Sequence, residues 1–397
     1  MNTSNSYIPF HIYLFIFGAF YYWILPLVIL KCNLLEGMPG VQLLDEYNFQ
    51  HVESIYLLII FLLVISFIIG SVLPLRFRKI KPVNKVSTTL ISPRDIFLLS
   101  LPFFIYGQYI VFNARGFLFK GYTAAHGEDT MGPIATINTI FLVLYLYLKY
   151  IKSDNIWRKR AIQLCKLSLI EFSVVLLGLG SRMYVLIPII ALMVSYLRYN
   201  KLNSRLIFTV LIVAFIFLTI GIWRISSEGM NWTLLLYIGG AEPLFTWISA
   251  ISYFLSNDIQ MFAFPQNFIT SFFNFIPRFL FPSKGLYIQP INGNYDSPLG
   301  ATNLITSLLA DFGLIGACLA LFLLGFILTH ILYNWRNIYG QVYYCCVCGI
   351  LPFQFFRDAI PIVNKMALFN MLIIPLFLFV FIRITIKYNT REKSTIR

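Results

Sequence analysis

Four arginines stand almost alone at the ends of long apolar segments, and they are the strongest candidates for chemistry in this sequence. They are Arg182, Arg224, Arg278 and Arg357. A guanidinium group stays charged at physiological pH and presents a planar fork of donors that fits a phosphate. A cation at the rim of an apolar segment is costly unless an anion or a polar path stabilises it. The four residues therefore predict a binding site for an anion such as a pyrophosphate.

The residues around Arg182 suit an anion in a second way. The stretch 178–182 reads Gly-Leu-Gly-Ser-Arg and joins two apolar runs with almost no linker. Glycines permit a tight reversal, so we expect free backbone amides beside the guanidinium, at the start of the next helix, where the helix dipole favours anions. The alternative is an arginine that extends to the membrane surface and neutralises lipid head groups.

Arg278 and Lys284 flank a strongly apolar stretch that carries a proline near each end. Prolines restrict the backbone, so the two cations would border a stiff apolar surface. This combination suits a lipid with an anionic head group, and an amphipathic helix lying on anionic lipid is the alternative. Arg224 follows Trp223 directly, a pair that is also typical of an interfacial anchor.

Two carboxylates in apolar surroundings are the candidate acidic groups. Glu242 lies midway along the apolar stretch 233–256, where water contact would let it act as a base or orient an acceptor. Asp311 lies in the first turns of a predicted span, where an unpaired charge is costly, so we expect it to pair with an arginine. A purely structural ion pair explains Asp311 equally well. Asp358 follows Arg357 directly and could neutralise it.

Composition predicts the elements that position these residues. Of the 397 residues, 59% are hydrophobic and only 12% are charged, which is too apolar for a soluble protein of this size. We therefore predict an all-α polytopic integral membrane protein, with a single transmembrane domain over 1–397 and about ten spanning helices. Their expected positions are 10–30, 54–75, 95–113, 133–151, 164–180, 183–198, 206–223, 307–333, 341–356 and 366–386.

The basic residues indicate how these helices are oriented. Of the 30 Lys and Arg residues, 21 lie in alternate gaps, whereas 12 of the 16 Asp and Glu residues lie on the opposite face. The positive-inside rule then predicts cytoplasmic termini and places the four arginines on the outer face, the periplasm in a Gram-negative inner membrane. The net charge of +14 is thus a topology signal and does not indicate a nucleic-acid partner. The basic gaps are 76–94, 149–166, 198–205, 334–340 and 383–397.

The largest external gap, the predicted periplasmic loop 224–302, is where we expect function to lie. Glycines, Glu242 and Pro243 interrupt its apolar stretch 233–256, which favours an interfacial or re-entrant helix. A second apolar stretch, 267–281, is short for a crossing, and counting both stretches would give twelve helices. The stretch 292–303 is rich in amides and hydroxyls, which suit either a sugar or a plain loop.

Metal and cofactor chemistry has no support in the sequence. The four histidines are scattered, and the six cysteines lie mostly within apolar segments, so neither type shows metal-ligand spacing. The sequence also contains no Gly-rich phosphate loop and no nucleophile elbow. We therefore expect neither a metal nor a cofactor.

Several short motifs occur in a recognisable order. Gly-Ser-Arg ends a span at 180–182, Ile-Pro-Arg and Pro-Ser-Lys lie at 276–278 and 282–284, Asp-Phe-Gly-Leu-Ile-Gly follows at 311–316, and Phe-Arg-Asp at 356–358. This order resembles the bacterial O-antigen polymerases, the Wzy-type oligosaccharide repeat-unit polymerases, over roughly residues 165–386. The chain departs from the family pattern at Asp358, where Gly often follows the arginine, and this weakens the assignment of a role to Arg357.

The resemblance implies a GT-C-like glycosyltransferase of the inner membrane with its active site facing the periplasm. Such an enzyme transfers the growing glycan from undecaprenyl pyrophosphate to a new lipid-linked repeat unit. Its partners would be undecaprenyl-pyrophosphate-linked oligosaccharides, membrane lipids and a chain-length regulator protein. On this basis we predict catalytic roles for Arg182, Arg278 and Glu242, and substrate-binding roles for Arg224, Lys284, Arg357 and Asp311.

Three other functions stay open at this point. An O-antigen ligase would share the fold, the lipid donor and the basic external site, and would differ in its acceptor. A repeat-unit flippase or other transporter would be expected to have more helices, no large external loop and charges nearer the bilayer midplane. A polyprenyl-phosphate-sugar transferase would carry an acidic pair in its first external loop, where this chain has Asp45 and Glu46.

Overall fold

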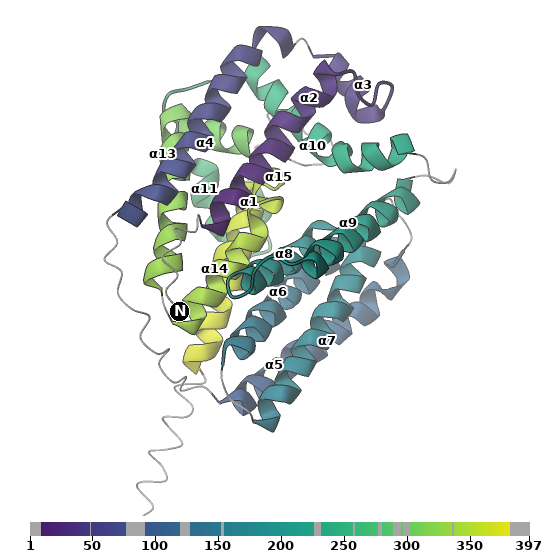
Figure 1. The fold of residues 1–397 in the computed structure, drawn as a ribbon, viewed down its shortest axis with the longest axis vertical. Helices are drawn as coiled ribbons and strands as arrows, with labels where there is room; N and C mark the ends of the chain where they lie inside the picture. Colours follow the sequence, from purple (N-terminus) through teal and green to yellow (C-terminus); the bar gives the residue numbers. More distant parts are fainter. Residues whose placement is uncertain are drawn as a thin grey trace, which may run out of the picture. The chain divides into compact units, whose positions relative to one another are not determined.

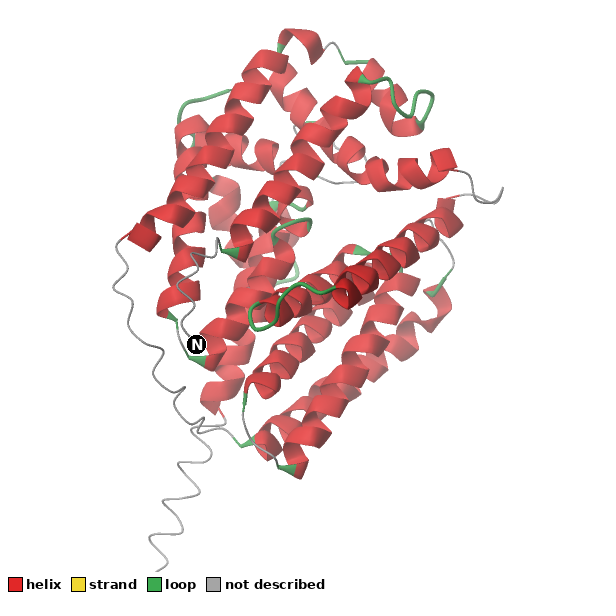
Figure 2. Cartoon of the chain, viewed as in Figure 1, coloured by secondary structure: helices red, strands yellow, loops and turns green. Residues whose placement is uncertain are grey.

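The structure is a computed structural model that describes residues 9–47, 49–76, 92–119, 128–151, 155–225, 232–256, 259–276, 280–288, 295–296, 302–335 and 337–381. Within these ranges the chain forms helices joined by turns, without strands (Figure 2). Contacts divide the chain into two compact units. The first comprises 1–80, 201–333 and 350–365, and the second comprises 81–200, 334–349 and 366–397. The single domain expected over the whole chain stays a prediction.

Ten apolar helices match the ten segments expected from the sequence. Among the described residues, seven helices are long and apolar enough to cross a membrane, and three more are apolar but shorter, which agrees with a polytopic membrane protein. The seven are Phe10–Lys31, Glu53–Leu75, Pro93–Phe117, Thr130–Tyr150, Ile156–Gly178, Leu304–Asn334 and Ile360–Phe381, and the shorter three are Met183–Leu197, Ser204–Phe217 and Ile338–Ile350.

The first unit begins with a long helical rod that changes type in its middle. Helix α1 (Phe10–Ala19) continues as a π-helical turn, η1 (Phe20–Ile24), and then as α2 (Leu25–Lys31). π-helical turns within α-helices are rare and are frequent at functional sites. The other helical elements of this unit are α3 (Pro39–Asp45), η2 (Phe49–His51), α4 (Glu53–Arg76), α9 (Ser204–Ile225), α10 (Trp232–Leu255), α11 (Gln266–Thr270), η4 (Ser271–Phe275), α12 (Lys284–Tyr287), α13 (Leu304–Asn334), α15 (Gln354–Arg357) and α16 (Ile360–Asn364).

Two glycines bring helices α4 and α13 close together (Figure 1). A Cβ atom on Gly70 would overlap the backbone of Phe322, and one on Gly325 would overlap the backbone of Phe67. Small residues let helix backbones approach in membranes, where van der Waals packing largely holds helices together. The α4–α13 crossing therefore depends on both glycines.

Helix α13 is broken at Gly313, where the backbone enters the left-handed region with φ at +69°. A Cβ atom at this position would lie 2.7 Å from the backbone of Phe262, so only glycine fits. The stretch 260–263 lies against the break. The amide of Leu314 donates to the carbonyl of Gln260 at 2.9 Å, and two further backbone hydrogen bonds join the same stretches. Part of the large loop thus packs directly onto a spanning helix.

Helix α10 is continuous across the middle of the stretch 233–256, and its expected interfacial or re-entrant placement stays a prediction. The helix runs through Gly239, Gly240 and Pro243. Pro243 has no N–H to donate to the carbonyl of Gly239, four residues earlier, and the hydroxyl of Tyr21 donates to that carbonyl instead, at 2.6 Å. This contact with η1 replaces the missing hydrogen bond. In the described part of the other apolar stretch, 267–281, the helical elements are the short α11 and η4.

The second unit is built on three helices that pack against one another, α5 (Pro93–Ala114), α6 (Glu128–Tyr150) and α7 (Ile156–Gly178). Helix α6 is largely buried, with five consecutive fully buried side chains over 140–144. The remaining elements are η3 (Arg115–Phe117), α8 (Met183–Leu197), α14 (Ile338–Ile350) and the π-helix η7 (Lys365–Ile373) at the boundary between the units.

Candidate functional site

An ion pair in the first unit joins Glu242 of α10 to Arg357 of α15, two residues that lie 115 positions apart in the sequence. The Arg357 Nε and Glu242 Oε1 atoms lie 3.1 Å apart, and the two side chains keep 30% and 24% of their surface exposed. The hydroxyl of Tyr22, on the π-helical turn η1, donates to the same carboxylate oxygen at 3.3 Å. Both side chains are therefore held within the first unit and keep part of their surface exposed, while the Arg357 Nε atom itself is buried.

Neighbouring residues hold Arg357 in place. The amide of Thr302 donates to the Arg357 carbonyl at 3.1 Å, and the side-chain amide of Gln354 donates to Asp358 Oδ2 at 3.0 Å. Burial raises the pKa of Asp358, and the adjacent Arg357 guanidinium opposes this effect only in part.

Asn303 organises the end of the large loop from a fully buried position. Its side-chain oxygen accepts a hydrogen bond from Trp23 Nε1 at 2.9 Å, and its backbone amide donates to Ser249 Oγ at 2.8 Å. The stretch 292–303 was a candidate for sugar binding, but the side chain at its end binds the protein. Asn303 thus aligns η1, α10 and the start of α13, the elements that carry or adjoin the ion pair.

Asp311 pairs with backbone amides and with no arginine of the described residues, contrary to expectation. Its two carboxylate oxygens accept hydrogen bonds from the backbone amides of Asn267 at 2.9 Å and Phe268 at 2.7 Å. These two amides lie in the first turn of α11, where backbone N–H groups have no hydrogen-bond partner within their own helix. The carboxylate therefore fastens a loop helix to the broken helix α13, and its substrate-binding role stays a prediction.

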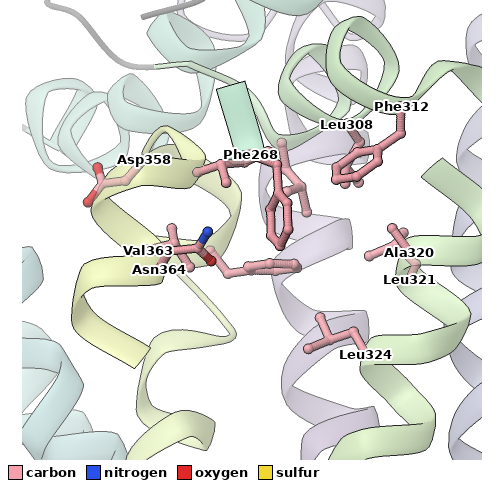
Figure 3. Close-up of a pocket in the computed structure, with 12 residues that line it drawn as sticks. Phe268, Leu308, Phe312, Ala320, Leu321, Leu324, Asp358, Val363 and Asn364 are labelled. Carbon is pink, nitrogen blue, oxygen red and sulfur yellow. The ribbon is translucent and has the colours of Figure 1, made fainter. Parts of the chain in front are cut away.

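An apolar pocket of about 160 Å³ adjoins this segment of the first unit. Its wall combines side chains from α11, both halves of α13 and the stretch 355–364. Figure 3 shows Phe268, Leu308 and Leu321 around the hollow, while the Asp358 carboxylate lies at its edge and points away from them. The pocket and the Glu242–Arg357 pair thus share one short piece of chain.

In the turn before Arg182, in the second unit, the amides of Gly180 and Ser181 are bonded to the preceding helix and are not free. Gly180 takes the left-handed conformation with φ at +91°. Its amide donates to the Leu177 carbonyl at 2.9 Å, and the Ser181 amide donates to the Leu176 carbonyl at 2.8 Å. This is the Schellman arrangement that closes a helix C-terminus. Arg182 itself is partly exposed at the start of α8, with no acidic partner among the described residues.

The remaining predicted site residues are described only in part. Lys284 donates to the carbonyls of Ile276 at 2.7 Å and Asn274 at 3.5 Å, so its ammonium group helps to fold the loop. Arg224 lies in the last turn of α9, but its side chain is outside the described part of the structure. Arg278 lies wholly outside the described residues. The convergence of the four arginines on one ligand therefore stays a prediction.

The Glu242–Arg357 pair in the first unit can bind an anion and accept a proton at neighbouring groups. Arg357 supplies the positive charge, and Glu242 supplies an acceptor whose orientation Tyr22 fixes. Across the described ranges, no group of three His, Cys, Asp or Glu residues could hold a metal ion. Tyr22 and Gln354 are members of the site that sequence reasoning missed, because both lie within apolar runs without a recognisable motif.

Comparisons with known proteins identify no relative. No family model matches the chain, and neither a curated protein nor a solved structure matches it.

Proposed function

We propose that this protein is a membrane-embedded glycosyltransferase, an O-antigen polymerase that uses an undecaprenyl-pyrophosphate-linked donor. The observation that carries the proposal is the partly exposed Glu242–Arg357 pair on a unit built of apolar helices. A guanidinium and a carboxylate that lie together and keep part of their surface exposed support the binding of an anionic, lipid-linked substrate. The order of short motifs along 165–386 adds support from the sequence.

In the proposed reaction, a hydroxyl of the new repeat unit attacks the anomeric carbon of the donor sugar. The new glycosidic bond forms as the bond between sugar and pyrophosphate breaks, and the electron pair leaves with the pyrophosphate. Arg357 stabilises the developing negative charge, and Glu242 accepts the hydroxyl proton. Catalytic roles for Arg182 and Arg278 belong to the proposal on the ground of the sequence alone. Fixed guanidinium groups supply this stabilisation without a nucleotide.

The proposal includes a location and an orientation. The chain would have a GT-C-like fold in the inner membrane, with both termini in the cytoplasm and the Glu242–Arg357 pair on the periplasmic side. The asymmetric distribution of Lys and Arg between the gaps supports this orientation. Membrane lipids and a chain-length regulator protein would be its partners.

The test is lipopolysaccharide analysis in a deletion strain that carries single variants. We expect Arg182→Ala, Arg278→Ala and Arg357→Ala to leave core plus one repeat unit, because losing one charge-stabilising donor costs about 10²–10³ in rate. Lys31→Ala is the matched control, since Lys31 is another external cation but pairs with Glu53. Membrane levels of each variant are measured alongside.

The same lipopolysaccharide analysis, by gel electrophoresis, distinguishes a polymerase from a ligase or a flippase. A full ladder of chain lengths in the arginine variants would show that these residues do not carry polymerisation. Loss of all O-antigen, without the single-unit band, would instead favour a ligase or a flippase.

A further inference from the structure

The large loop presents bulky apolar side chains at its surface, in a stretch that carries no charge. Residues 259–276 contain no Asp, Glu, Lys or Arg. Within this stretch Phe262 and Phe264 keep 68% and 76% of their surface exposed, and Met261 is exposed as well. Contiguous exposed apolar side chains mark a surface that contacts lipid or protein. We call Met261, Phe262 and Phe264 the loop patch.

The loop patch continues an exposed apolar face of the spanning helix α13. The Ile315 amide donates to the Met261 carbonyl at 3.0 Å, so the two residues are neighbours. Ile315 is itself exposed, as are Leu319 and Leu323, and their spacing of four places them on one side of the helix. A helix of this length and composition crosses a bilayer, so its exposed apolar face lies against acyl chains. The loop patch therefore extends a lipid-facing surface.

The break in α13 indicates the depth of the loop patch. Residues 314–334 follow the break, and at about 1.5 Å per residue they cover roughly 30 Å, the thickness of the hydrocarbon core. With Asn334 at one boundary of this core, Leu314 lies at the other. The stretch 260–263 is hydrogen-bonded to α13 just beyond the break. The loop patch thus lies at the outer boundary of the core, within reach of the acyl chains.

Backbone groups around the loop patch are bonded to protein atoms, as contact with lipid requires. The Ala263 amide donates to the Phe312 carbonyl at 3.2 Å. The amides of Asn267 and Phe268 donate to the Asp311 carboxylate. In water these amides would find partners without help from the protein, whereas among acyl chains an unpaired amide is costly. The internal hydrogen bonds therefore favour acyl chains over water around this part of the loop.

We propose that the loop patch is immersed in the outer leaflet, where its three side chains lie among the acyl chains of bilayer phospholipids. The stretch 260–264 is then a membrane anchor and not part of a solvated loop. Acyl chains are favoured over a second protein because they already cover the adjoining face of α13. The Asp311 carboxylate makes this immersion tolerable by pairing the first amides of α11. The proposal does not depend on the reaction proposed above.

Oxidation by radiolytic hydroxyl radicals tests the proposal on the wild-type chain, so no substitution can disturb folding. Met261 is 62% exposed, whereas the control Met38, in the first external gap, is only partly exposed. In vesicles of phosphatidylethanolamine and phosphatidylglycerol, we expect Met261 to be oxidised about fivefold more slowly than Met38, because acyl chains shield it from water. If water covered both residues, the greater exposure of Met261 would reverse this order. Oxidation of Met261 at or above the rate of Met38 would overturn the proposal.

A photoreactive side chain identifies what covers the loop patch. Phe262→benzoylphenylalanine keeps an aromatic ring at this position, and Glu46→benzoylphenylalanine is the control, since Glu46 is exposed in another external gap. After illumination in the same vesicles, mass spectrometry should find phospholipid adducts on the Phe262 variant and about tenfold fewer on the Glu46 variant. A covalent dimer would assign the loop patch to a second copy of the chain. Equal adduct yields for the two variants would show that water covers it. Either result refutes the proposal.

Discussion

Replacing Glu242 with Gln should tighten the binding of an anionic lipid head group. Glu242 and the ligand compete for the same guanidinium, because the carboxylate lies 3.1 Å from Arg357 Nε in the ligand-free chain. Glutamine keeps the size of the side chain and can still accept a hydrogen bond from Tyr22, but it removes the competing negative charge. The ligand then no longer has to displace an ion pair.

The exposure of the Glu242–Arg357 ion pair determines how much the substitution should change the binding affinity. Exposed ion pairs contribute about 0.2–1 kcal/mol, and breaking a buried pair costs roughly 3–5 kcal/mol. With 30% and 24% of the two side chains exposed, this pair falls between those limits. A value of about 1–2 kcal/mol corresponds to an affinity increase of roughly 5–30-fold.

The assay is equilibrium binding of undecaprenyl pyrophosphate to the purified full chain. Glu53→Gln is the matched control, because it breaks the other described ion pair, Lys31–Glu53 at 2.5 Å, and should leave the affinity unchanged. Arg357→Gln should weaken binding. Weaker binding by Glu242→Gln, or wild-type binding by Arg357→Gln, would refute this reasoning. If Glu242 also accepts the proton, its Gln variant will bind tightly and transfer slowly.

Three further predictions concern stability in detergent. Asp311→Asn should cost about 1–3 kcal/mol, because the NH2 group that replaces one carboxylate oxygen cannot accept a hydrogen bond from Asn267 or Phe268. A thermal melt that matches wild type would contradict this. Gly313→Ala should destabilise the protein strongly, because it combines a positive φ with a 2.7 Å backbone clash. Gly132→Ala, in open space on α6, is the control and should be neutral or stabilising. Similar melting temperatures for the two variants would show that Gly313 is not required at the break. Asp358→Asn should gain stability over wild type as the pH rises above the ordinary carboxyl pKa of about 4, because the raised pKa of Asp358 means that its ionisation destabilises the folded protein. A stability difference between variant and wild type that does not change with pH would disprove this.

The spanning helices could be predicted from the sequence because their apolar lengths match a bilayer. A helix was expected over 233–256, but its continuity could not be predicted, because it depends on a contact from a distant part of the chain. A proline leaves one carbonyl of its helix without an N–H partner, and sequence reasoning shows Pro243 and two glycines in this stretch. It cannot see that the hydroxyl of Tyr21 lies 2.6 Å from the orphaned Gly239 carbonyl.

The turn at Gly180 was misread for a local reason. Glycine just after an apolar run is a helix C-cap signal, and that signal predicts amides already bound to the preceding helix. The expectation of free amides beside Arg182 did not take this C-cap signal into account. Glu242 and Arg357 were each identified from charge in an apolar setting, but their pairing was not, since 115 positions of chain separate them and no pattern links them.

The stretch 260–263 supplies the carbonyl partners of Leu314 and Ile315 beyond the break in α13. In an unbroken helix these two amides would donate to the carbonyls four residues earlier, and their hydrogens would exchange with solvent only when that turn frayed. Here these two hydrogens should exchange only when the stretch 260–263 separates from α13. Hydrogen exchange at these two amides of α13 would therefore report how often the stretch 260–263 separates from the helix, without a label or a substrate.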